Sequence, residues 1–583
     1  MSTGTPFGNR VEVLPFIRTL RAYKREDLKA DLRAGINVAL LAAPQGMAYA
    51  LIAGLPLRYG IYCAAVAPFL GAVFARSPFI ILGPTNATSV LLLSAFGAMG
   101  LSGPEKLQLL PMLVTMSGAF LIFGAMLNVA NLVQYVSRSV ITGYVTAAAV
   151  LIIANQLRNV LGIELQQTSS TFVHVCAETL SHLGEMHPSA LLIGTISLLV
   201  YLLLRWKLGT LPNVAITLIA MSLLARWLPT RASLQYLDAV DAGDWQVTLP
   251  RMNFGDISRV ASASLAIAVL SMLEGVSVGK SLAARAGARL NVNQEVFSMG
   301  IANIGCGLLS GMPASGSPTR SALNWTSGAS GPMASLFCGI LCAAGVFLVG
   351  PYIAYVPKAV LAVLVICIGV SLINRRQIRI MTRTTRADAL VFYTTLVSGL
   401  LFPLDVAIYL GVGTSIVLFM RQAAMPQMVE YAFDTSGQLT ELGSAQARTD
   451  PEVSIVHVEG NLFFGAAELF RDQMRRVFED PNLRVIVLKL RNAHHLDATS
   501  VAALEELVRY AEGTNCTLLV SEVRPDTMRI FDRAGLFGVL KKDRIFADVA
   551  ENPTSSTAAA IRAAKGIIGS ESARVSIYAD ERS

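Results

Sequence analysis

Two short segments, one in each half of the chain, have the residue types of an anion-binding site. The first reads FIILGPTNATS (79–89) and the second reads ASGSPTRSA (314–322). In each, a small residue precedes Pro and then Thr, which predicts a helix N-terminus with Pro84 or Pro318 at the first helical position. The backbone N–H groups there are unpaired and partially positive, so two such ends that face each other favour an anion. Arg320 adds a full positive charge.

These segments, with part of an earlier apolar stretch, supply the candidate substrate-binding residues. Gln45 and Tyr49 are four residues apart and therefore share one face of a helix. The competing interpretation is structural: two kinked helices that contain proline, and polar side chains that pack between helices. The predicted binding residues are Gln45, Tyr49, Thr85, Asn86, Ala87, Thr319, Arg320 and Ser321.

An acidic residue, Glu274, stands at the end of a long apolar run in the segment SMLEGVSVGK (271–280). A carboxylate inside a membrane span is costly and usually functional. It could pair with Arg320, bind a cation or carry a proton; the structural alternative is a side chain that reaches the membrane surface. Because all six histidines lie outside the apolar segments, Glu274 is the candidate for proton coupling.

The composition indicates a membrane protein rather than several soluble domains. Of the 583 residues, 53% are hydrophobic and only 15% charged, and no Asp or Glu occurs from Gly35 to Pro104. The net charge of +8 comes mainly from basic residues beside apolar segments, which indicates membrane topology and not nucleic-acid binding. The seven cysteines form no CxxC pair and are expected to be buried, inert thiols. The charged, amphipathic stretch 11–33 is not a cleavable signal, so the first span is expected to remain.

Twelve apolar segments are long enough to be spans, and two shorter ones, 84–98 and 318–329, are predicted to be half-helices. Seven spans separate equivalent points of the two short segments, and since seven is odd, the second half must be inverted. The stretch 171–187 is too polar to span and is expected at the interface. The predicted spans are 35–55, 58–76, 107–130, 139–156, 189–205, 211–228, 261–279, 295–312, 333–350, 357–374, 387–402 and 404–420.

The distribution of Lys and Arg gives the orientation. Seven basic residues between Arg10 and Arg33 precede the first span, which predicts a cytoplasmic N-terminus. The loops after even-numbered spans are also basic, whereas those after odd-numbered spans are poor in Lys and Arg or acidic, as in 238–244. The even count of spans places the C-terminal domain in the cytoplasm too. The predicted location is the inner membrane, with multiple passes.

Several motifs in the right order resemble the SulP family of anion transporters, the bacterial relatives of solute carrier family 26. They are PQGMAY (44–49), GLP (54–56), YGIY (59–62), GPT (83–85), EGVSVGKS (274–281), NQE (293–295) and PASGSPTRSALN (313–324). The resemblance implies fourteen transmembrane segments as 7+7 inverted repeats. When the two half-helices are counted as spans 3 and 10, a core domain would hold spans 1–4 and 8–11 and a gate domain spans 5–7 and 12–14. The anion would lie between the third and tenth helices. It further implies an elevator-like movement of core against gate, with Glu274 as the coupling acid or as a residue of a cation site.

The last part of the chain has a soluble α/β pattern. Strands are expected near 453–458, 485–490 and 517–521, with helices at 465–479, 499–512 and 525–535. This resembles a STAS domain, in which Asp497, Thr499 and Ser500 match the regulatory phosphorylation loop. Ala498 lacks the hydroxyl expected after Asp497, so a dimerisation and regulatory role is favoured. The predicted divisions are 1–34 N-terminal segment, 35–425 transport domain, 426–451 linker, 452–551 STAS domain and 552–583 flexible tail, with a short helix at 556–567.

These features predict a secondary active transporter of a small anion (sulfate, bicarbonate or dicarboxylate), coupled to protons as a symporter. The alternatives are an anion exchanger, a sodium-coupled bicarbonate symporter, a nucleobase-type carrier, or a sensor anchored by its spans. No GxxxxGK[ST] motif occurs, which disfavours an ATP-driven pump. An enzymatic role, a cofactor, a metal and a nucleic-acid partner are not expected. The lipid bilayer and a second copy of the chain are the expected partners.

Overall fold

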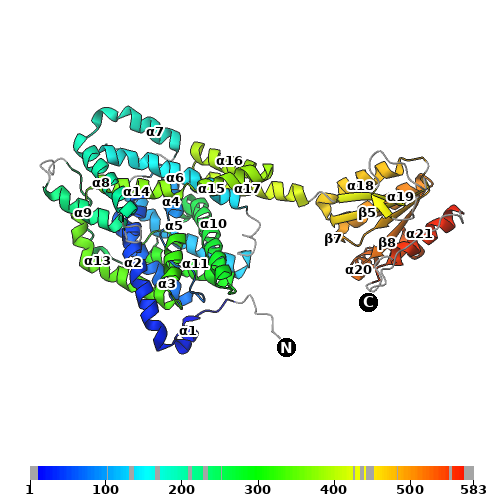
Figure 1. The fold of residues 1–583 in the computed structure, drawn as a ribbon, viewed down its shortest axis with the longest axis horizontal. Coiled ribbons are helices and arrows are strands. Elements are labelled where there is room, and N and C mark those ends of the chain that lie inside the picture. The colour runs from blue at the N-terminus through cyan, green and yellow to red at the C-terminus, as the bar shows by residue number, and fades with distance from the viewer. Residues whose placement is uncertain are drawn as a thin grey trace. The chain divides into compact units, whose positions relative to one another are not determined.

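The computed structural model describes most of the chain, which divides into two compact units, Met1–Ser415 and Ile416–Ser583 (Figure 1). Each unit is described by itself. The described residues are 11–101, 103–129, 137–163, 171–207, 213–227, 234–250, 253–423, 427–433, 439–441, 452–481, 483–549 and 555–569. The start of the predicted N-terminal segment, including Arg10, and the last residues of the predicted tail lie outside them.

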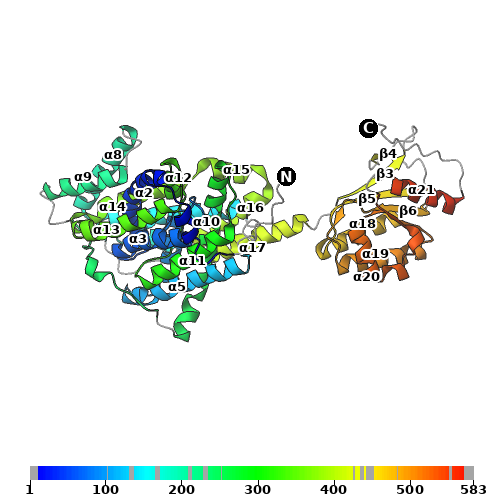
Figure 2. The same cartoon turned by 90° about the horizontal axis from the view of Figure 1, so that it is seen from below.

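Unit 1 is helical and consists of two groups of helices, the core and the gate. Helices within each group pack extensively on one another, for example α11 on α5 and α14 on α6. Figures 1 and 2 show α8 and α9 at the edge of the unit. The core helices are α2 (Arg25–Ile52), α3 (Leu57–Phe74), α4 (Asn86–Ala98), α5 (Gly103–Met126), α10 (Phe254–Arg285), α11 (Val292–Leu308), α12 (Pro318–Thr326) and α13 (Met333–Val349). The gate helices are α6 (Arg138–Leu161), α8 (Pro188–Lys207), α9 (Asn213–Trp227), α14 (Lys358–Leu372), α16 (Arg386–Leu401) and α17 (Leu404–Ala423).

A helix occupies each of the fourteen predicted segments, which confirms the polytopic, inverted-repeat fold. Nine helices in the described part of the chain are long and apolar enough to cross a membrane, and α4 and α9 are shorter apolar helices. Two predictions need correction. Helix α2 begins at Arg25, well before the predicted span, and Pro84 precedes α4 instead of opening it, because Thr85 is the N-cap. Pro318, by contrast, is the first residue of α12, as predicted.

Small residues allow core helices to approach closely, as is typical inside membranes. A Cβ atom on Gly60 of α3 would lie 1.9 Å from the carbonyl oxygen of Gly46 on α2. A Cβ on Gly118 of α5 would lie 2.6 Å from the carbonyl oxygen of Gly300 on α11. Any larger side chain at these positions would force the helices apart.

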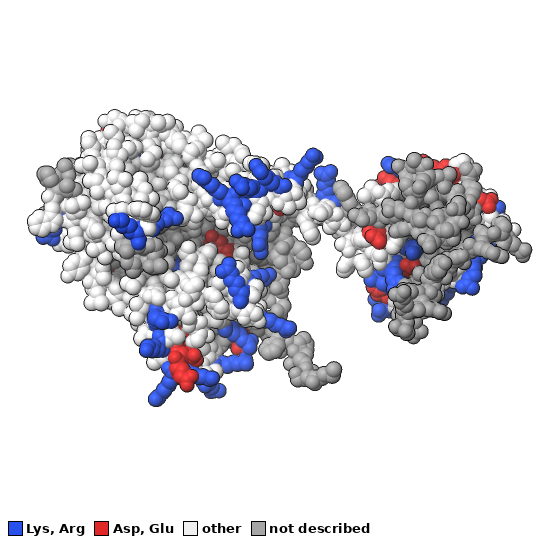
Figure 3. Space-filling model, in the orientation of Figure 1, with Lys and Arg blue, Asp and Glu red and all other residues white. Residues whose placement is uncertain are grey.

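The charged surface of unit 1 is concentrated in a few places. On the face shown in Figure 3, most of the unit is uncharged, and Lys and Arg side chains gather near α1 (Phe16–Ala22) and near α15 (Arg375–Thr384) and α17. Helix α15 lies in the basic loop that follows the predicted span 357–374. The polar stretch predicted to lie at the interface forms two short helices, α7 (Phe172–Ser181) and η2 (Leu183–Glu185).

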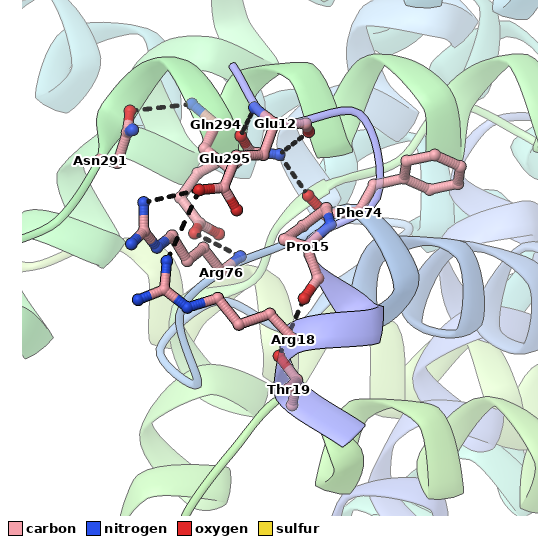
Figure 4. A network of polar contacts seen from close by, with 9 residues as sticks. All are labelled: Glu12, Pro15, Arg18, Thr19, Phe74, Arg76, Asn291, Gln294 and Glu295. Atoms are coloured by element: carbon pink, nitrogen blue, oxygen red, sulfur yellow. Dashed lines mark hydrogen bonds and ion pairs between the residues drawn. The ribbon is translucent and has the colours of Figure 1, made fainter. Parts of the chain in front are cut away.

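A network of polar contacts holds the N-terminal segment on the core (Figure 4). The Gln294 side chain of α11 accepts a hydrogen bond from the Glu12 N–H at 2.7 Å and donates to the Glu12 carbonyl at 3.0 Å. It also donates to the Phe74 carbonyl at the end of α3. The Glu12 carboxylate lies 3.7 Å from Arg18 and 3.5 Å from Arg76. The segment is therefore attached to two core helices.

Unit 2 contains a six-strand path, β4-β3-β5-β6-β8-β9, with helices on both faces (Figures 1 and 2). Strands β5 (Val453–Asn461), β6 (Val485–Lys489), β8 (Thr517–Val523) and β9 (Ile545–Ala547) are parallel. Helices α18 (Phe464–Phe478), α19 (Ala498–Gly513) and α20 (Pro525–Arg533) follow the predicted pattern. Side chains from α18 and α19 form a core with β5, β6 and β8.

The predicted linker differs from the structure, whereas the helix predicted within the tail is confirmed. The predicted linker contains strands β3 (Gln427–Phe433) and β4 (Leu439–Glu441), and β3 pairs with β5. The short helix predicted at 556–567 is present as α21 (Ser555–Ile568). Its Ala560, Ile561 and Ala564 are buried against Ile455, Val485, Val487 and Leu519, so this part of the predicted tail packs on the sheet.

Candidate functional site

A two-stranded antiparallel pair brings the two half-helices together. Strand β1 (Leu82–Gly83) immediately precedes α4, and β2 (Ser315–Gly316) immediately precedes α12. Leu82 pairs with Gly316 and Gly83 with Ser315, and the Ser317 N–H donates to the Ile81 carbonyl at 3.1 Å. Since each strand leads directly into a helix N-terminus, the pairing places both N-termini at one location in the core. The sequence predicted this convergence but not the strands.

Two side chains at the start of α4 cap its N-terminus. The Thr85 hydroxyl accepts from the Thr88 N–H, and the Thr88 hydroxyl accepts from the Thr85 N–H, both at 3.3 Å. This reciprocal capping satisfies two of the N–H groups that a helix start leaves unpaired. Asn86 and Ala87 form the first turn and are buried.

Arg320 joins the two half-helices. It is 1% exposed and lies in the first turn of α12. Its Nη2 donates to the Pro84 carbonyl at 2.8 Å and its Nη1 to Gln45 Oε1 at 3.3 Å. Its Nε has no hydrogen-bond partner among the described residues. A buried guanidinium with a free donor is costly unless an acceptor completes it, and an anion is the acceptor that matches its charge.

Gly83 makes room for this guanidinium. Its φ is +154°, and a Cβ atom there would lie 2.9 Å from Arg320 Nη2. A similar close approach occurs on the other strand, where a Cβ on Gly316 would lie 2.7 Å from the Cα of Gly275 on α10. The glycines of the GPT and SGS motifs are therefore required by the packing around the site.

Glu274 lies beside the same half-helix. Its Oε2 accepts a hydrogen bond from the Thr85 hydroxyl at 3.1 Å, and its side chain is 8% exposed. It does not reach the surface, which excludes the structural alternative for this residue in the described conformation. No ion pair with Arg320 is recorded in the part of the chain that the structure describes, although the two charges are close enough to interact electrostatically.

Of the other predicted site residues, some lie close to Arg320 and others do not. Gln45 contacts Arg320, and Tyr49 is buried within electrostatic reach of both Arg320 and Glu274. Thr319 is exposed and its hydroxyl lies 3.2 Å from that of Ser317. Ser321, however, accepts from the Ile81 N–H at 3.0 Å, so its hydroxyl oxygen already holds the strand before α4.

Two residues that support the site, Asn303 and Tyr144, were not predicted from the sequence. Asn303 of α11 exchanges two hydrogen bonds of 2.9 Å with the backbone of Ala314 and thereby fixes the approach to β2. The Tyr144 hydroxyl donates to the Ala87 carbonyl at 2.8 Å. An Asn in an apolar helix and an aromatic with a polar tip are signals that could have identified both.

In unit 2, Asp497 caps two helices. Its Oδ1 accepts from the Ser500 N–H of α19 at 2.9 Å, and its Oδ2 accepts from the Phe464 N–H of α18 at 2.7 Å. Partial burial raises the pKa of Asp497, but the hydrogen bonds from Ser500 and Phe464 outweigh it, and the net pKa lies below its usual value. The Ser500 hydroxyl is buried and donates to the Leu462 carbonyl at 2.7 Å, whereas Thr499 is exposed.

Comparison with known proteins identifies the family. Residues 28–395 match the description "Sulfate permease family", and residues 444–552 match "STAS domain". The chain belongs to the sulfate permease family. It is 26% identical over 559 residues to "Sulfate transporter 4.1, chloroplastic" of Arabidopsis thaliana, with 92% of this chain and 81% of that one covered. It is 27% identical over 563 residues to "Sodium-independent sulfate anion transporter" of Bos taurus, with coverages of 90% and 89%.

Solved structures share the fold of this member of the sulfate permease family. The structure described as "The overall structure of SLC26A9" matches with a TM-score of 0.84 at 17% identity and covers 96% of this chain and 93% of that one. The transmembrane domain of a cyanobacterial bicarbonate transporter, BicA, matches with a TM-score of 0.59 at 21% identity, with coverages of 67% and 99%. The protein is therefore a membrane transporter of the anion-transporting type and not an enzyme.

Proposed function

We propose that this chain is a secondary active transporter that carries a small anion, with sulfate as the first candidate, in symport with protons. The observation that carries the proposal is the buried Arg320 guanidinium between two helix N-termini, whose Nε has no hydrogen-bond partner among the described residues. Partial positive charge from both helices and a full charge from Arg320 favour an anion with several acceptor oxygens. A neutral nucleobase would leave this charge uncompensated.

The binding residues of this proposal are Gln45, Tyr49, the Arg320 guanidinium and the backbone N–H groups of Asn86, Ala87 and Thr319. The neighbouring N–H groups of Thr85, Arg320 and Ser321 already donate to Thr88 or Ser317. The two half-helices supply N–H donors that cost no reorganisation when the anion arrives, because β1 and β2 already hold them. Ser321 has a supporting role, since its hydroxyl accepts from the Ile81 N–H and its own N–H donates to the Ser317 carbonyl at 3.0 Å. Thr85 connects the anion site to Glu274, because its hydroxyl donates to that carboxylate.

Glu274 is the coupling residue of the proposed mechanism. Binding of an anion beside an ionised Glu274 brings two like charges close together, and protonation of Glu274 removes that repulsion. Anion and proton then bind together and cross together. Alternating access follows from an elevator-like movement of the core, which contains the whole site, against the gate.

The test is uptake into proteoliposomes of labelled sulfate, bicarbonate, chloride, a C4-dicarboxylate and uracil, with and without an imposed proton or sodium gradient. Sulfate uptake should be accelerated by an inward proton gradient and should fall at least about 100-fold in Arg320→Ala, because a buried charged hydrogen-bond partner is lost. Arg58→Ala is the matched control: Arg58 is a partly exposed core arginine paired with Asp244 at 2.6 Å, and its removal should change uptake by less than about threefold.

Four outcomes would contradict parts of the proposal. Wild-type rates in a folded Arg320→Ala protein would refute the assigned site. Acceleration by internal anion without any gradient effect would indicate an exchanger, and acceleration by sodium alone with bicarbonate would indicate the sodium-coupled alternative. Uptake of uracil and of no anion would indicate a nucleobase carrier.

A further inference from the structure

One face of the half-helix α4 is hydrogen-bonded to the gate. Ala87 and Ser94 are seven residues apart, which is two helical turns, so they lie on the same side of α4. The Tyr144 hydroxyl of α6 donates to the Ala87 carbonyl at 2.8 Å. The Leu404 N–H at the start of α17 donates to the Ser94 hydroxyl, also at 2.8 Å. Both donors belong to the gate and both acceptors to the core.

The two hydrogen bonds are shielded from their surroundings. Tyr144 is 1% exposed, and Ser94, Ala87 and Leu404 are fully buried. The Leu404 N–H belongs to the first turn of α17, where no carbonyl of the same helix can accept it. A side chain of the other domain meets this need, since an N–H group left unpaired inside a membrane protein is costly. Neither bond could exchange for water without separation of the two domains.

We propose that Tyr144 and Ser94 form a two-point latch that holds the core against the gate and must release in every transport cycle. This inference rests on the proposed elevator-like movement. A shift of the core by even one helical residue along α6 and α17 would break both bonds together. The latch therefore sets the relative stability of the described conformation.

The position of the latch also connects it to the substrate. Ala87 lies in the first turn of α4, whose N–H groups are offered to the anion in the proposed site. An anion bound there and the Tyr144 hydroxyl act on the same helical turn from opposite directions. Tyr144 is thus a positioning residue, which acts on the site through α4.

The experiment measures the distance between one spin label on the core and one on the gate by pulsed electron paramagnetic resonance. Exposed positions for the labels are Arg285→Cys at the end of α10 and Trp206→Cys on α8, with the partly exposed Cys176 and Cys367 replaced by Ser. The full chain is reconstituted in lipid vesicles, with and without sulfate. The label distances give the ratio of the described conformation to the one in which the core has moved. This ratio is compared between the wild type, the variants Tyr144→Phe and Ser94→Ala (the unlatched variants) and two control variants.

Each unlatched variant should shift the ratio of conformations about 3- to 10-fold away from the described one, because it loses one buried hydrogen bond. If both bonds break in one step, the shifts should multiply in the double variant. Tyr409→Phe is the first control: its hydroxyl donates to the Ser262 carbonyl across the same boundary at 2.8 Å, but Tyr409 is 37% exposed. Ser117→Ala is the second, since it removes a buried hydroxyl that bonds within α5. Both controls should stay within about twofold of the wild type.

Ratios within about twofold of the wild type in both unlatched variants would overturn the latch. A shift in only one of them would overturn its two-point form and assign the contact to that residue. Both substitutions remove only a hydroxyl oxygen, and Tyr144→Phe keeps the aromatic ring. Both variants are therefore expected to fold and to test the latch independently. A single distance in the wild type that never responds to sulfate would instead refute the elevator-like movement itself.

Discussion

At the scale of single residues, Arg320 shows what a sequence can and cannot reveal. Its position beside a helix start in an apolar stretch predicted a buried charge next to an anion site. Its bonds to Gln45 and to the Pro84 carbonyl depend on segments far away in the chain, which no local pattern specifies. The same holds for Ser321, whose predicted role in binding is taken over by a bond to the backbone of Ile81.

Glu274 gives the first prediction at this scale. Glu274→Gln keeps the size and the acceptor oxygen for Thr85 but cannot take up a proton, so uptake should continue without any acceleration by a proton gradient. The measurement is the initial uptake rate at several imposed pH differences.

The control for this experiment is Glu295→Gln. Glu295 is equally buried in the core but accepts from the Arg76 and Ser77 N–H groups, away from the anion site. Its variant should keep the gradient dependence. A gradient that still drives uptake fully in Glu274→Gln would exclude this residue as the coupling acid.

Asp497 gives a prediction about stability. Asp497→Ala removes the cap of α19 and an acceptor for α18, and should lower the free energy of unfolding of the STAS domain by about 1 kcal/mol at pH 7. Because the folded state lowers the pKa of Asp497, its contribution is complete above the unfolded pKa of about 3.9 and disappears as the pH falls through the lower folded pKa.

Urea denaturation of the STAS domain at a series of pH values measures this effect. The difference between the wild type and Asp497→Ala should shrink below about pH 4. A difference that stays constant down to the most acidic pH would mean that the carboxylate charge has no part in the cap.

At the scale of elements, hydrophobic length predicted the spans well, whereas their ends required tertiary information. Helix α2 continues to Arg25 through a charged stretch that no span length would include. Thr85 replaces Pro84 at the start of α4 because its hydroxyl caps the first turn, and β1 needs the preceding residues in an extended conformation. Two-residue strands carry no periodic signal, so the β1–β2 pair was beyond any reading of the sequence.

The N-terminal segment gives a prediction at this scale. Gln294→Ala removes the paired hydrogen bonds to the backbone of Glu12 and should release this segment from the core. The backbone amides of residues 11–18 should then exchange hydrogen for deuterium at least about tenfold faster, as measured by mass spectrometry.

Ser298→Ala serves as the control, because Ser298 lies one turn further along α11 and bonds to the Gly71 carbonyl without touching the N-terminal segment. It should leave the exchange of residues 11–18 unchanged. Equal exchange in Gln294→Ala and the wild type would show that the ion pairs of Glu12 with Arg18 and Arg76 suffice.

At the scale of the whole molecule, the two units show different limits of prediction. The inverted repeat followed from the parity of the spans, and the STAS domain from its alternating pattern. The extent of that domain did not, because β3 and β4 are recognised only through the strands that they pair with. The helix at 556–567 was predicted, but only the structure shows that it packs on the sheet. Composition assigned these segments to a linker and a tail, whereas the sheet makes them part of the fold.

The strand pair before the half-helices has a consequence for energetics. Because β1 and β2 are hydrogen-bonded to each other and belong to the same group of helices, the donors from both repeats form one rigid cradle. In the proposed mechanism, a cradle that keeps its shape binds the anion with the same affinity whichever compartment it opens to. The direction of net transport is then set by the electrochemical gradients of the anion and of the coupled ion, and not by tighter binding on one side of the membrane.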